Sequence, residues 1–312
     1  SHGCHTMLIS GGYEIFANII GKKIGFKEII SNVLVSKNGL LTGGLKGGIV
    51  DGKGKLSYLR KRIKTLDVKK KETVELNGSD NALLMYTSGT TGKPKGVMLT
   101  HDNILNGGKN VSLSHNLNKL DKALCVLPLY HINGFIVTVM GPLVSNSSLV
   151  LCEKFSATNF WHQISKFKCT WFSIVPTIVS SLINKYSENE FKLLNTSMVK
   201  FGRSASAALA PETHKKFEKK FEINLIETMG LTETCAPILS NPRDPNKIKY
   251  GSPGIAYGND VKILDDNFIE VKRNEIGQIC VRGKNVMKEY YKNPEETKKS
   301  FYKDWLLTGD LG

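Results

Sequence analysis

From about Asn81 onwards, the hydrophobic positions of this chain switch repeatedly between two spacings. Short apolar runs at 123–127, 148–151 and 171–175 have the length and composition of buried strands. The segments around them have the apolar spacing of helices, at 135–143, 158–167 and 176–185. Strands that alternate with helices favour parallel sheets whose faces are covered by helices. The sequence therefore predicts an α/β fold.

Two further features complete this pattern. A helix is expected to begin after His101, where Asp102 or Asn103 can cap it. Towards the end of the chain the helical spacing stops, and short strands are predicted at 261–264 and 279–282. The α/β part should therefore be followed by a β-rich part.

The first 65 residues follow a pattern of their own. A short apolar strand at 6–9 ends in Ser10-Gly11-Gly12, and an amphipathic helix follows it. The apolar positions of this helix are Ile15, Phe16, Ile19 and Ile20. Strands at 29–35 and 39–43 and then a basic helix complete the segment.

The charged stretch 66–79, which includes three consecutive lysines, indicates a linker. We therefore expect one domain at 1–65 and a second at 80–312. No repeat and no low-complexity tract interrupts either of them.

The strongest candidate for chemistry is the run Y-T-S-G-T-T-G-K-P-K-G-V at 86–97, directly after an apolar strand. Its glycines permit close backbone approach to a ligand, and its hydroxyls, N–H groups and lysines can bind phosphate oxygens. A P-loop is excluded, because Pro94 follows Lys93 where that motif needs Ser or Thr. Composition alone would equally suit a flexible surface loop. The candidate phosphate-binding residues are Thr87, Ser88, Gly89, Thr90, Thr91, Gly92, Lys93 and Lys95.

Three further segments follow in order: L-P-L-Y-H-I-N-G at 127–134, E-T-M-G-L-T-E at 227–233 and W-L-L-T-G-D at 305–310. Together with the first run they resemble the motifs of the adenylate-forming superfamily, which includes acyl-CoA synthetases, luciferases and peptide-synthetase adenylation domains. The resemblance covers 80–312 and implies the subdomains of that family's large domain. It also implies that the chain stops before the family's hinge and small C-terminal lid domain.

The resemblance implies an acid–thiol ligase that uses ATP and Mg²⁺. A small carboxylic acid attacks the α-phosphate of ATP to give an acyl-adenylate and pyrophosphate. The thiol of CoA, or of phosphopantetheine on an acyl carrier protein, then displaces AMP. The first step needs positioning and charge neutralisation rather than a nucleophilic side chain. As a fragment, this chain would turn over weakly or not at all, and a non-catalytic nucleotide-binding remnant is the alternative.

Individual roles follow from the matched positions. Glu233 corresponds to the family's Mg²⁺ ligand, and a hard carboxylate suits that ion. Thr232 would contact the α-phosphate, and Asp310 would accept hydrogen bonds from both ribose hydroxyls. Met229 stands where the family usually stacks an aromatic ring on adenine. His131 would line the acyl channel. The catalytic set is Thr87, Lys95, His131, Thr232 and Glu233, and the nucleotide set is completed by Ser204, Ala205, Thr228 and Gly230.

Each of these positions also has a purely structural interpretation: capping for the Thr232–Glu233 pair, a turn for Asp310, packing for His131. Arg203, inside the small-residue run 202–207, is unusually bulky for its place. The acyl pocket is expected to draw on Phe135, Trp171, Phe172 and Gly230.

The segment 1–65 resembles part of a phosphoserine-phosphatase-like haloacid dehalogenase (HAD) domain. That resemblance implies phosphate binding by Ser10 and Lys55. However, the aspartate nucleophile and the metal-binding motif of that family are not matched, and phosphoryl-aspartate chemistry needs the nucleophile. A HAD-type phosphatase is therefore the third hypothesis.

Composition changes this picture little. The net charge of +15 comes mostly from lysines spread along the chain, and no aromatic-interleaved basic module accompanies them, so nucleic acid is not an expected partner. The six cysteines contain no C-x-x-C pair, which indicates free thiols in a cytoplasmic protein. No apolar stretch is long enough for an integral membrane segment, and no secretory signal opens the chain.

Overall fold

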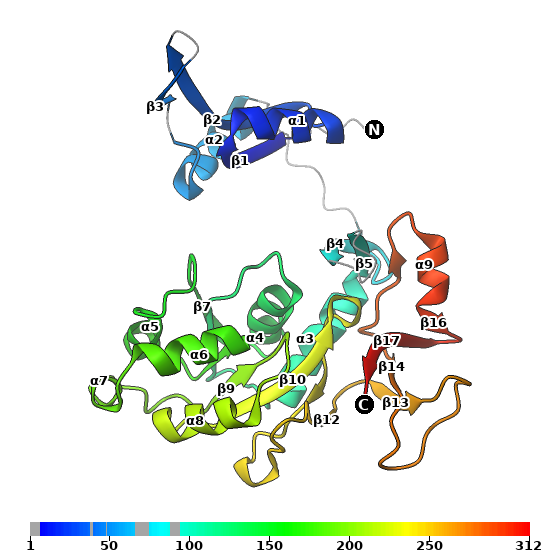
Figure 1. Cartoon of the computed structure of the whole chain (residues 1–312). Coiled ribbons are helices and arrows are strands. Elements are labelled where there is room, and N and C mark those ends of the chain that lie inside the picture. Colours follow the sequence, from blue (N-terminus) through cyan, green and yellow to red (C-terminus); the bar gives the residue numbers. More distant parts are fainter. Residues whose placement is uncertain (1–6, 38–39, 48, 66–74, 88–93) are drawn as a thin grey trace. The chain divides into compact units, whose positions relative to one another are not determined.

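The computed structural model describes residues 7–37, 40–47, 49–65, 75–87 and 94–312. By its internal contacts the chain divides into two compact units, Ser1–Glu75 and Leu76–Gly312 (Figure 1). The loop positions 88–93, which carry six of the predicted phosphate-binding residues, lie outside the described residues.

The first unit is a small three-stranded sheet with two helices. Its elements are β1 (Met7–Tyr13), α1 (Glu14–Ile24), β2 (Glu28–Lys37), β3 (Leu40–Lys46) and α2 (Gly52–Thr65). The strand order is β1-β2-β3, with β1 parallel and β3 antiparallel to β2. The predicted order of elements is confirmed, but the first strand runs through Ser10-Gly11-Gly12 to Tyr13 instead of ending there.

Helix α1 packs differently from the expectation. Its predicted apolar residues, from Ile15 to Ile20, are all more than half exposed. The buried residues of the helix are the small ones, Ala17 and Gly21. A Cβ at Gly21 would lie only 2.5 Å from the Cδ1 of Ile29, so the helix approaches the sheet too closely for a larger side chain. Periodicity alone could not reveal this preference for the small-residue face.

The second unit is built on a seven-stranded sheet, in the order β12-β11-β10-β9-β8-β6-β7. From β7 to β10 the neighbouring strands are parallel, as predicted, whereas β11 and β12 are antiparallel additions. The strands are β6 (Lys122–Cys125), β7 (Ser148–Leu151), β8 (Trp171–Ile174), β9 (Phe201–Ser204), β10 (Leu225–Leu231), β11 (Ala236–Ser240) and β12 (Ile255–Ala256).

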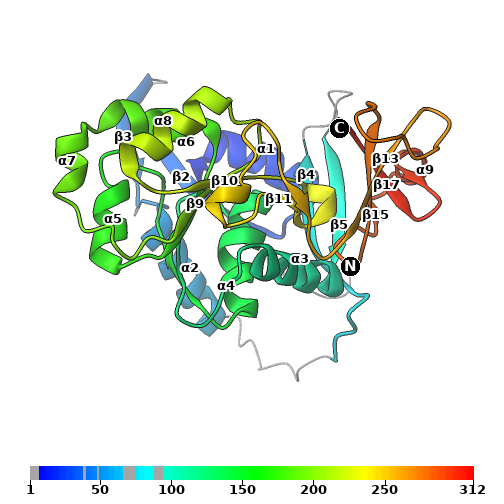
Figure 2. The same ribbon diagram turned by 90° about the horizontal axis from the view of Figure 1, so that it is seen from below.

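Helices cover both faces of this sheet (Figure 2). One face packs on α5, α6 and α8 in a core that includes Phe172 and Leu225, and the other packs on α3 and the π-helix η1 in a core that includes Trp171 and Ile226. Neighbouring residues of one strand thus enter opposite cores, as strand geometry requires. The helices are α3 (His101–Ser114), η1 (Asn133–Met140), α4 (Gly141–Val144), α5 (Phe160–Phe167), α6 (Pro176–Lys185), α7 (Glu188–Lys192) and α8 (Pro211–Phe221).

The N-cap of helix α3 lies two residues before the nearer of the two predicted caps, Asp102. Thr100 is the N-cap: its hydroxyl accepts a hydrogen bond from the backbone N–H of Asn103, and the Asn103 side chain accepts one from the N–H of Thr100. This reciprocal pair is a capping box. Asn103 is therefore its third helical residue rather than the cap.

Two smaller sheets complete the second unit. One has the order β15-β5-β4, and the other the order β13-β14-β17-β16. Their strands are β4 (Asn81–Thr87), β5 (Lys95–Thr100), β13 (Asp260–Leu264), β14 (Gln278–Arg282), β15 (Glu289–Tyr290), β16 (Phe301–Tyr302) and β17 (Trp305–Leu311), with α9 (Pro294–Lys299) and the 3₁₀ turns Thr232–Thr234 and Pro245–Lys247 between them. The β-rich end is as predicted.

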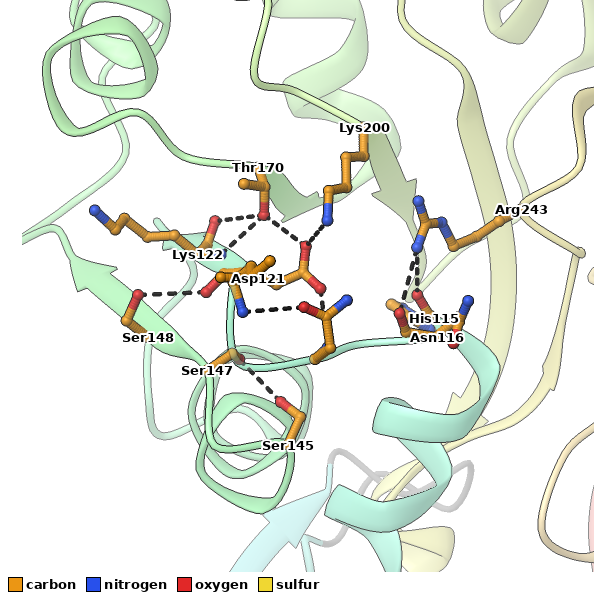
Figure 3. A network of polar contacts seen from close by, with 12 residues as sticks. His115, Asn116, Asp121, Lys122, Ser145, Ser147, Ser148, Thr170, Lys200 and Arg243 are labelled. Atoms are coloured by element: carbon orange, nitrogen blue, oxygen red, sulfur yellow. Dashed lines mark hydrogen bonds and ion pairs between the residues drawn. The ribbon is translucent and has the colours of Figure 1, made fainter.

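A polar cluster lies where β6, β8 and β9 begin. Asp121 accepts hydrogen bonds from the Lys200 ammonium at 2.7 Å, the Thr170 hydroxyl at 3.0 Å and the Asn118 backbone N–H at 2.9 Å (Figure 3). Its side chain is fully buried. Below we call these four residues the Asp121 cluster. In the described part of the chain, no helix has the length and apolar character needed to cross a membrane.

Candidate active site

A cavity of about 1310 Å³ lies in the second unit, and described residues from all four motif segments line it. They come from the β4–β5 hairpin, the loop before η1, the end of β10 with its 3₁₀ turn, and β17. These motif residues are Tyr86, Thr87, Pro94, Lys95, Leu127, Pro128, His131, Ile132, Asn133, Gly230, Leu231, Thr232, Glu233, Leu306, Leu307, Thr308 and Gly309. The fold thus brings together segments far apart in the sequence.

Lys95 opens β5 at the edge of this cavity. Its ammonium lies 3.1 Å from the Glu296 carboxylate and 4.6 Å from the centre of the Tyr290 ring. The side chain is only 16% exposed, so these contacts fix its direction. A cation held in this way can bind an anionic ligand in the cavity.

Glu233 is oriented by the same tyrosine. The Tyr290 hydroxyl donates a hydrogen bond to the Glu233 carboxylate at 2.7 Å. Burial and the adjacent charge of Glu233 raise the pKa of Tyr290, so it stays a donor at neutral pH. Among the described residues no group of three or more His, Cys, Asp or Glu is placed to hold a metal ion. One carboxylate beside a phosphate site nevertheless fits Mg²⁺, which is often held by one or two carboxylates plus phosphates.

Thr87 supplies a hydrogen-bonding group that the protein does not satisfy. Its hydroxyl oxygen is buried, lines the cavity and has no hydrogen-bond partner among the described residues. Leaving such a group unpaired costs about 1–3 kcal/mol. A phosphate oxygen in the cavity would remove that cost, so the side chain fits its predicted role.

His131 also lines the cavity and is exposed. Its ring lies 4.8 Å from that of Tyr130, and its backbone N–H donates to Pro128 at 3.1 Å. The loop before η1 therefore presents this imidazole to the cavity, as its predicted role in an acyl channel requires.

Several predicted residues do not line the cavity: Ser204, Ala205, Thr228, Met229 and Asp310. Met229 packs instead against a small core around Ile238. Asp310 is exposed, and its backbone N–H donates to the hydroxyl of the cavity-lining Thr308 at 3.1 Å. The side chains of Ser204 and Thr228 are buried with unpartnered hydroxyls.

The expected acyl pocket is wrong in three of its four residues. Trp171 and Phe172 are fully buried, on opposite faces of β8, and Phe135 packs in the core under α3. Only Gly230 lines the cavity. A central strand of a sheet covered on both faces has no side chain free for a pocket, which explains the two errors in β8.

The structure explains the unusual Arg203. Its guanidinium NH1 donates to the Asn133 side-chain oxygen at 2.6 Å and to the Ser173 hydroxyl at 2.8 Å. Ser173 donates to the same Asn133 oxygen at 3.0 Å, and the Asn133 side-chain NH₂ donates to the Ser206 hydroxyl oxygen at 3.1 Å. Asn133 and Ser206 line the cavity. We call these four residues the Arg203 network.

Sequence reasoning missed several cavity residues. Asn133 and Ser206 stand inside segments already singled out, one beside His131 and one in the run 202–207, so that signal was available. Tyr290 and Glu296 belong to no motif. They reach the cavity only because β15 pairs with β5.

The two residues predicted to bind phosphate in the first unit lie on separate elements. Ser10 is half-buried in β1, and Lys55 is exposed on α2.

Comparisons with known proteins agree on one family. The model of the family described as AMP-binding enzyme matches residues 31–291. A sulfoacetate–CoA ligase of Cupriavidus necator is 47% identical over 232 residues, which are 74% of this chain and 45% of that enzyme. An oxalate–CoA ligase of Saccharomyces cerevisiae is 38% identical over 236 residues, 75% of this chain and 42% of that enzyme. The chain thus spans about half the length of these curated relatives.

Solved structures agree with this result. ATP-bound MatB from Rhodopseudomonas palustris covers 95% of this chain with a TM-score of 0.72 and 27% identity, and 54% of that chain is matched. O-succinylbenzoate CoA synthetase from Bacillus subtilis in complex with AMP matches 80% of this chain with a TM-score of 0.69 and 29% identity. The match covers 51% of the synthetase chain. These likenesses extend into the first unit, and none of them supports the HAD-like resemblance of segment 1–65.

Proposed function

Because this chain belongs to the AMP-binding enzyme family, we propose that its second unit binds Mg-ATP and a carboxylic acid and serves in acyl-adenylate formation. The second unit would then be the central part of an adenylation domain. The observation that carries the proposal is that four motif segments line one cavity. Among the described residues, the buried Thr87 hydroxyl in this cavity has no hydrogen-bond partner.

Different residues of the cavity bind the phosphates and the metal. Lys95 and the hydroxyl of Thr87 neutralise and position the phosphates, together with residues 88–93. Glu233, held by Tyr290, would hold the Mg²⁺, whose charge would offset that of the phosphates. Thr232 contacts the α-phosphate, and Asp310 the ribose. These groups bind and orient, as attack by a carboxylate on phosphorus requires.

The second half of the reaction is thioester formation, and we propose CoA as the acceptor because the relatives are named as CoA ligases. Phosphopantetheine on an acyl carrier protein is the alternative acceptor. The described cysteines are free thiols, which suits a reducing cytoplasm. The relatives' names do not agree on one acid, since sulfoacetate, oxalate and 4-coumarate all occur.

Calorimetric titration of the chain with Mg-ATP tests this function. We expect saturable binding that depends on Mg²⁺, and Glu233→Gln should weaken Mg-ATP binding at least tenfold while leaving metal-free binding unchanged. Glu295→Gln, a substitution on the exposed surface of α9, is the matched control and should change neither. A folded chain without saturable binding would contradict the proposal, as would equal Mg²⁺ dependence in the Glu233 variant.

An assay for acyl-adenylate and pyrophosphate formation with a panel of acids separates the alternatives that the titration leaves open. A nucleotide-binding remnant would bind Mg-ATP but give no acyl-adenylate and pyrophosphate with any acid. No described contact favours phosphatase chemistry at Ser10 and Lys55, which is therefore not proposed.

A further inference from the structure

Arg203 carries a buried positive charge that the protein itself does not neutralise. The residue is only 2% exposed. In the described ranges no carboxylate forms an ion pair with it, and its NH1 has only the neutral oxygens of Asn133 and Ser173 as acceptors. Its Nε is buried and has no hydrogen-bond partner in the part of the chain that the structure describes. Burial lowers the pKa of Arg203 to about 9, so the group is still charged at neutral pH.

Such an arrangement is costly. A buried charge is normally paired, because the desolvation penalty is several kcal/mol per ion. Neutral oxygens offset only part of that penalty. The positive field of Arg203 therefore acts on whatever occupies the adjoining space.

The adjoining space is the cavity. Asn133 contacts the guanidinium directly, and Ser206 is one hydrogen bond further on; both line the cavity. The same NH1 also donates to the hydroxyl of Ser173, which is fully buried and itself donates to the Asn133 oxygen at 3.0 Å. The Arg203 network thus connects a buried cation to the cavity wall.

The donor order in this network is fixed. Arg203 has no acceptor, so the oxygen of the Asn133 amide must face it, and the NH₂ must face Ser206. The Ser206 oxygen therefore accepts, and its O–H is left to donate towards the cavity. Ser206 is exposed and has φ of +72°, a left-handed conformation that non-glycine residues rarely adopt and that is frequent at ligand sites.

We propose that the acid substrate carries a second anionic group, a carboxylate or sulfonate, and that the Ser206 hydroxyl binds this group in the field of Arg203. Ser206 is then a binding residue, and Arg203 is a positioning residue that acts through Asn133. The inference rests on the proposed function and deepens it, since it names the class of acid that the cavity accepts.

Malonate and propionate test this inference, because they share a three-carbon chain and differ in one carboxylate. The whole chain, saturated with Mg-AMP, is titrated with each acid in a calorimeter. We expect malonate to bind at least tenfold more tightly than propionate. Ser206→Ala should reduce this ratio about threefold or more, and Arg203→Gln should bring it within twofold of unity. Arg203→Lys, which keeps the charge, should retain most of the preference.

Arg243→Gln is the matched control. Arg243 packs against Phe201 at the start of β9 and donates to the His115 carbonyl, away from the cavity lining. Its loss should leave the acid preference unchanged. The affinity for Mg-AMP should be the same in all of these variants, whereas a general loss of structure would lower it.

Equal binding of the two acids, or binding of neither, by a chain that binds Mg-AMP would overturn this inference and leave the nucleotide function standing. A chain that binds no nucleotide would overturn both. If Arg203→Gln does not fold, Ser206→Ala decides, because Ser206 is exposed and its loss does not disturb the core; an unchanged ratio there rejects the proposal.

Discussion

Asp121 and Arg203 are both buried charges in the parallel part of the large sheet, but their surroundings differ. At the amino ends of β6, β8 and β9, Asp121 has a cationic partner, Lys200, and two further donors. Towards the carboxyl ends of β8 and β9, Arg203 has neutral partners only. Open α/β sheets bind their ligands beyond the carboxyl ends of the strands. The comparison indicates that the Asp121 cluster serves the fold alone, whereas the Arg203 network is completed by a ligand.

The ionisation of the two groups shows the same contrast. Burial alone would raise the pKa of Asp121, but hydrogen bonds from Lys200, Asn118 and Thr170 outweigh it and lower the pKa below its ordinary value. For Arg203, burial lowers the pKa, and no partner counteracts it. The protein thus stabilises the charged form of Asp121 and destabilises that of Arg203.

The largest expected effect on the free energy of unfolding comes from removing the carboxylate of the Asp121 cluster. Asp121→Asn should lower the free energy of unfolding by about 2 kcal/mol at pH 7, because it leaves the Lys200 ammonium without its acid; the partial exposure of Lys200 keeps the loss below that of a fully buried pair. Urea unfolding measures it. Asp260→Asn, which breaks an exposed pair with Arg282, should cost less than about 1 kcal/mol. Equal losses of stability in the two variants would show that the Asp121 cluster stabilises the fold no more than an exposed ion pair does.

The effect of Asp121→Asn should depend on pH. Because the pKa of Asp121 is lowered in the folded state, its contribution is complete above the unfolded-state pKa of about 4 and is lost as the pH falls through the folded-state value. The difference in unfolding free energy between wild type and variant should therefore be constant from pH 5 to 7 and shrink below about pH 4. A difference that persists at pH 2 would mean that the carboxylate charge is not responsible.

A smaller effect is expected from removing the uncompensated cation. Arg203→Met should change the free energy of unfolding by about 1 kcal/mol or less, because the loss of hydrogen bonds is offset by relief from burying a charge. Ser173 still donates to Asn133 in the variant. The same urea titration measures this change, and malonate should protect the wild type but not the variant. A loss larger than that of Asp121→Asn would show that Arg203 mainly holds the fold.

The smallest effect has the opposite sign. Ser206→Gly should raise the free energy of unfolding by about 0.5 kcal/mol, because glycine adopts the positive φ of this position without strain. It should also reduce the preference for malonate. Ser147→Gly, at a half-buried serine that is not among the positive-φ residues, serves as control and should lower stability slightly. A destabilised Ser206→Gly chain that keeps its preference would refute the binding role.

How much the sequence could predict depends on the range of the interactions involved. The strands at 148–151 and 171–174 follow from local apolar runs, and Thr87, Lys95, His131 and Glu233 follow from motifs whose chemistry is local. The role of Arg203 could not be predicted, because it depends on a hydrogen bond to Asn133, which is 70 residues away in the sequence.

The failures have the same physical origin. Aromatic residues of β8 were predicted to line a pocket, but helices cover both faces of that strand. The spacing of large apolar residues predicts an amphipathic helix for α1, but the helix packs through Ala17 and Gly21 instead of these residues. In both cases a neighbour distant in sequence decides which side chain is buried, and no local pattern records it.

The pairing of β15 with β5 has a consequence for the order of folding. Lys95 and Glu296 are 201 residues apart, and Tyr290, which orients Glu233, comes from the same late segment. Contacts between such distant residues form late, because a long loop must close first. On the ribosome, the hairpin of the phosphate motif is made early, yet its lysine and carboxylate become fixed only after β15 and α9 have emerged. Nucleotide binding would therefore follow the synthesis of β15 and α9 rather than that of the hairpin.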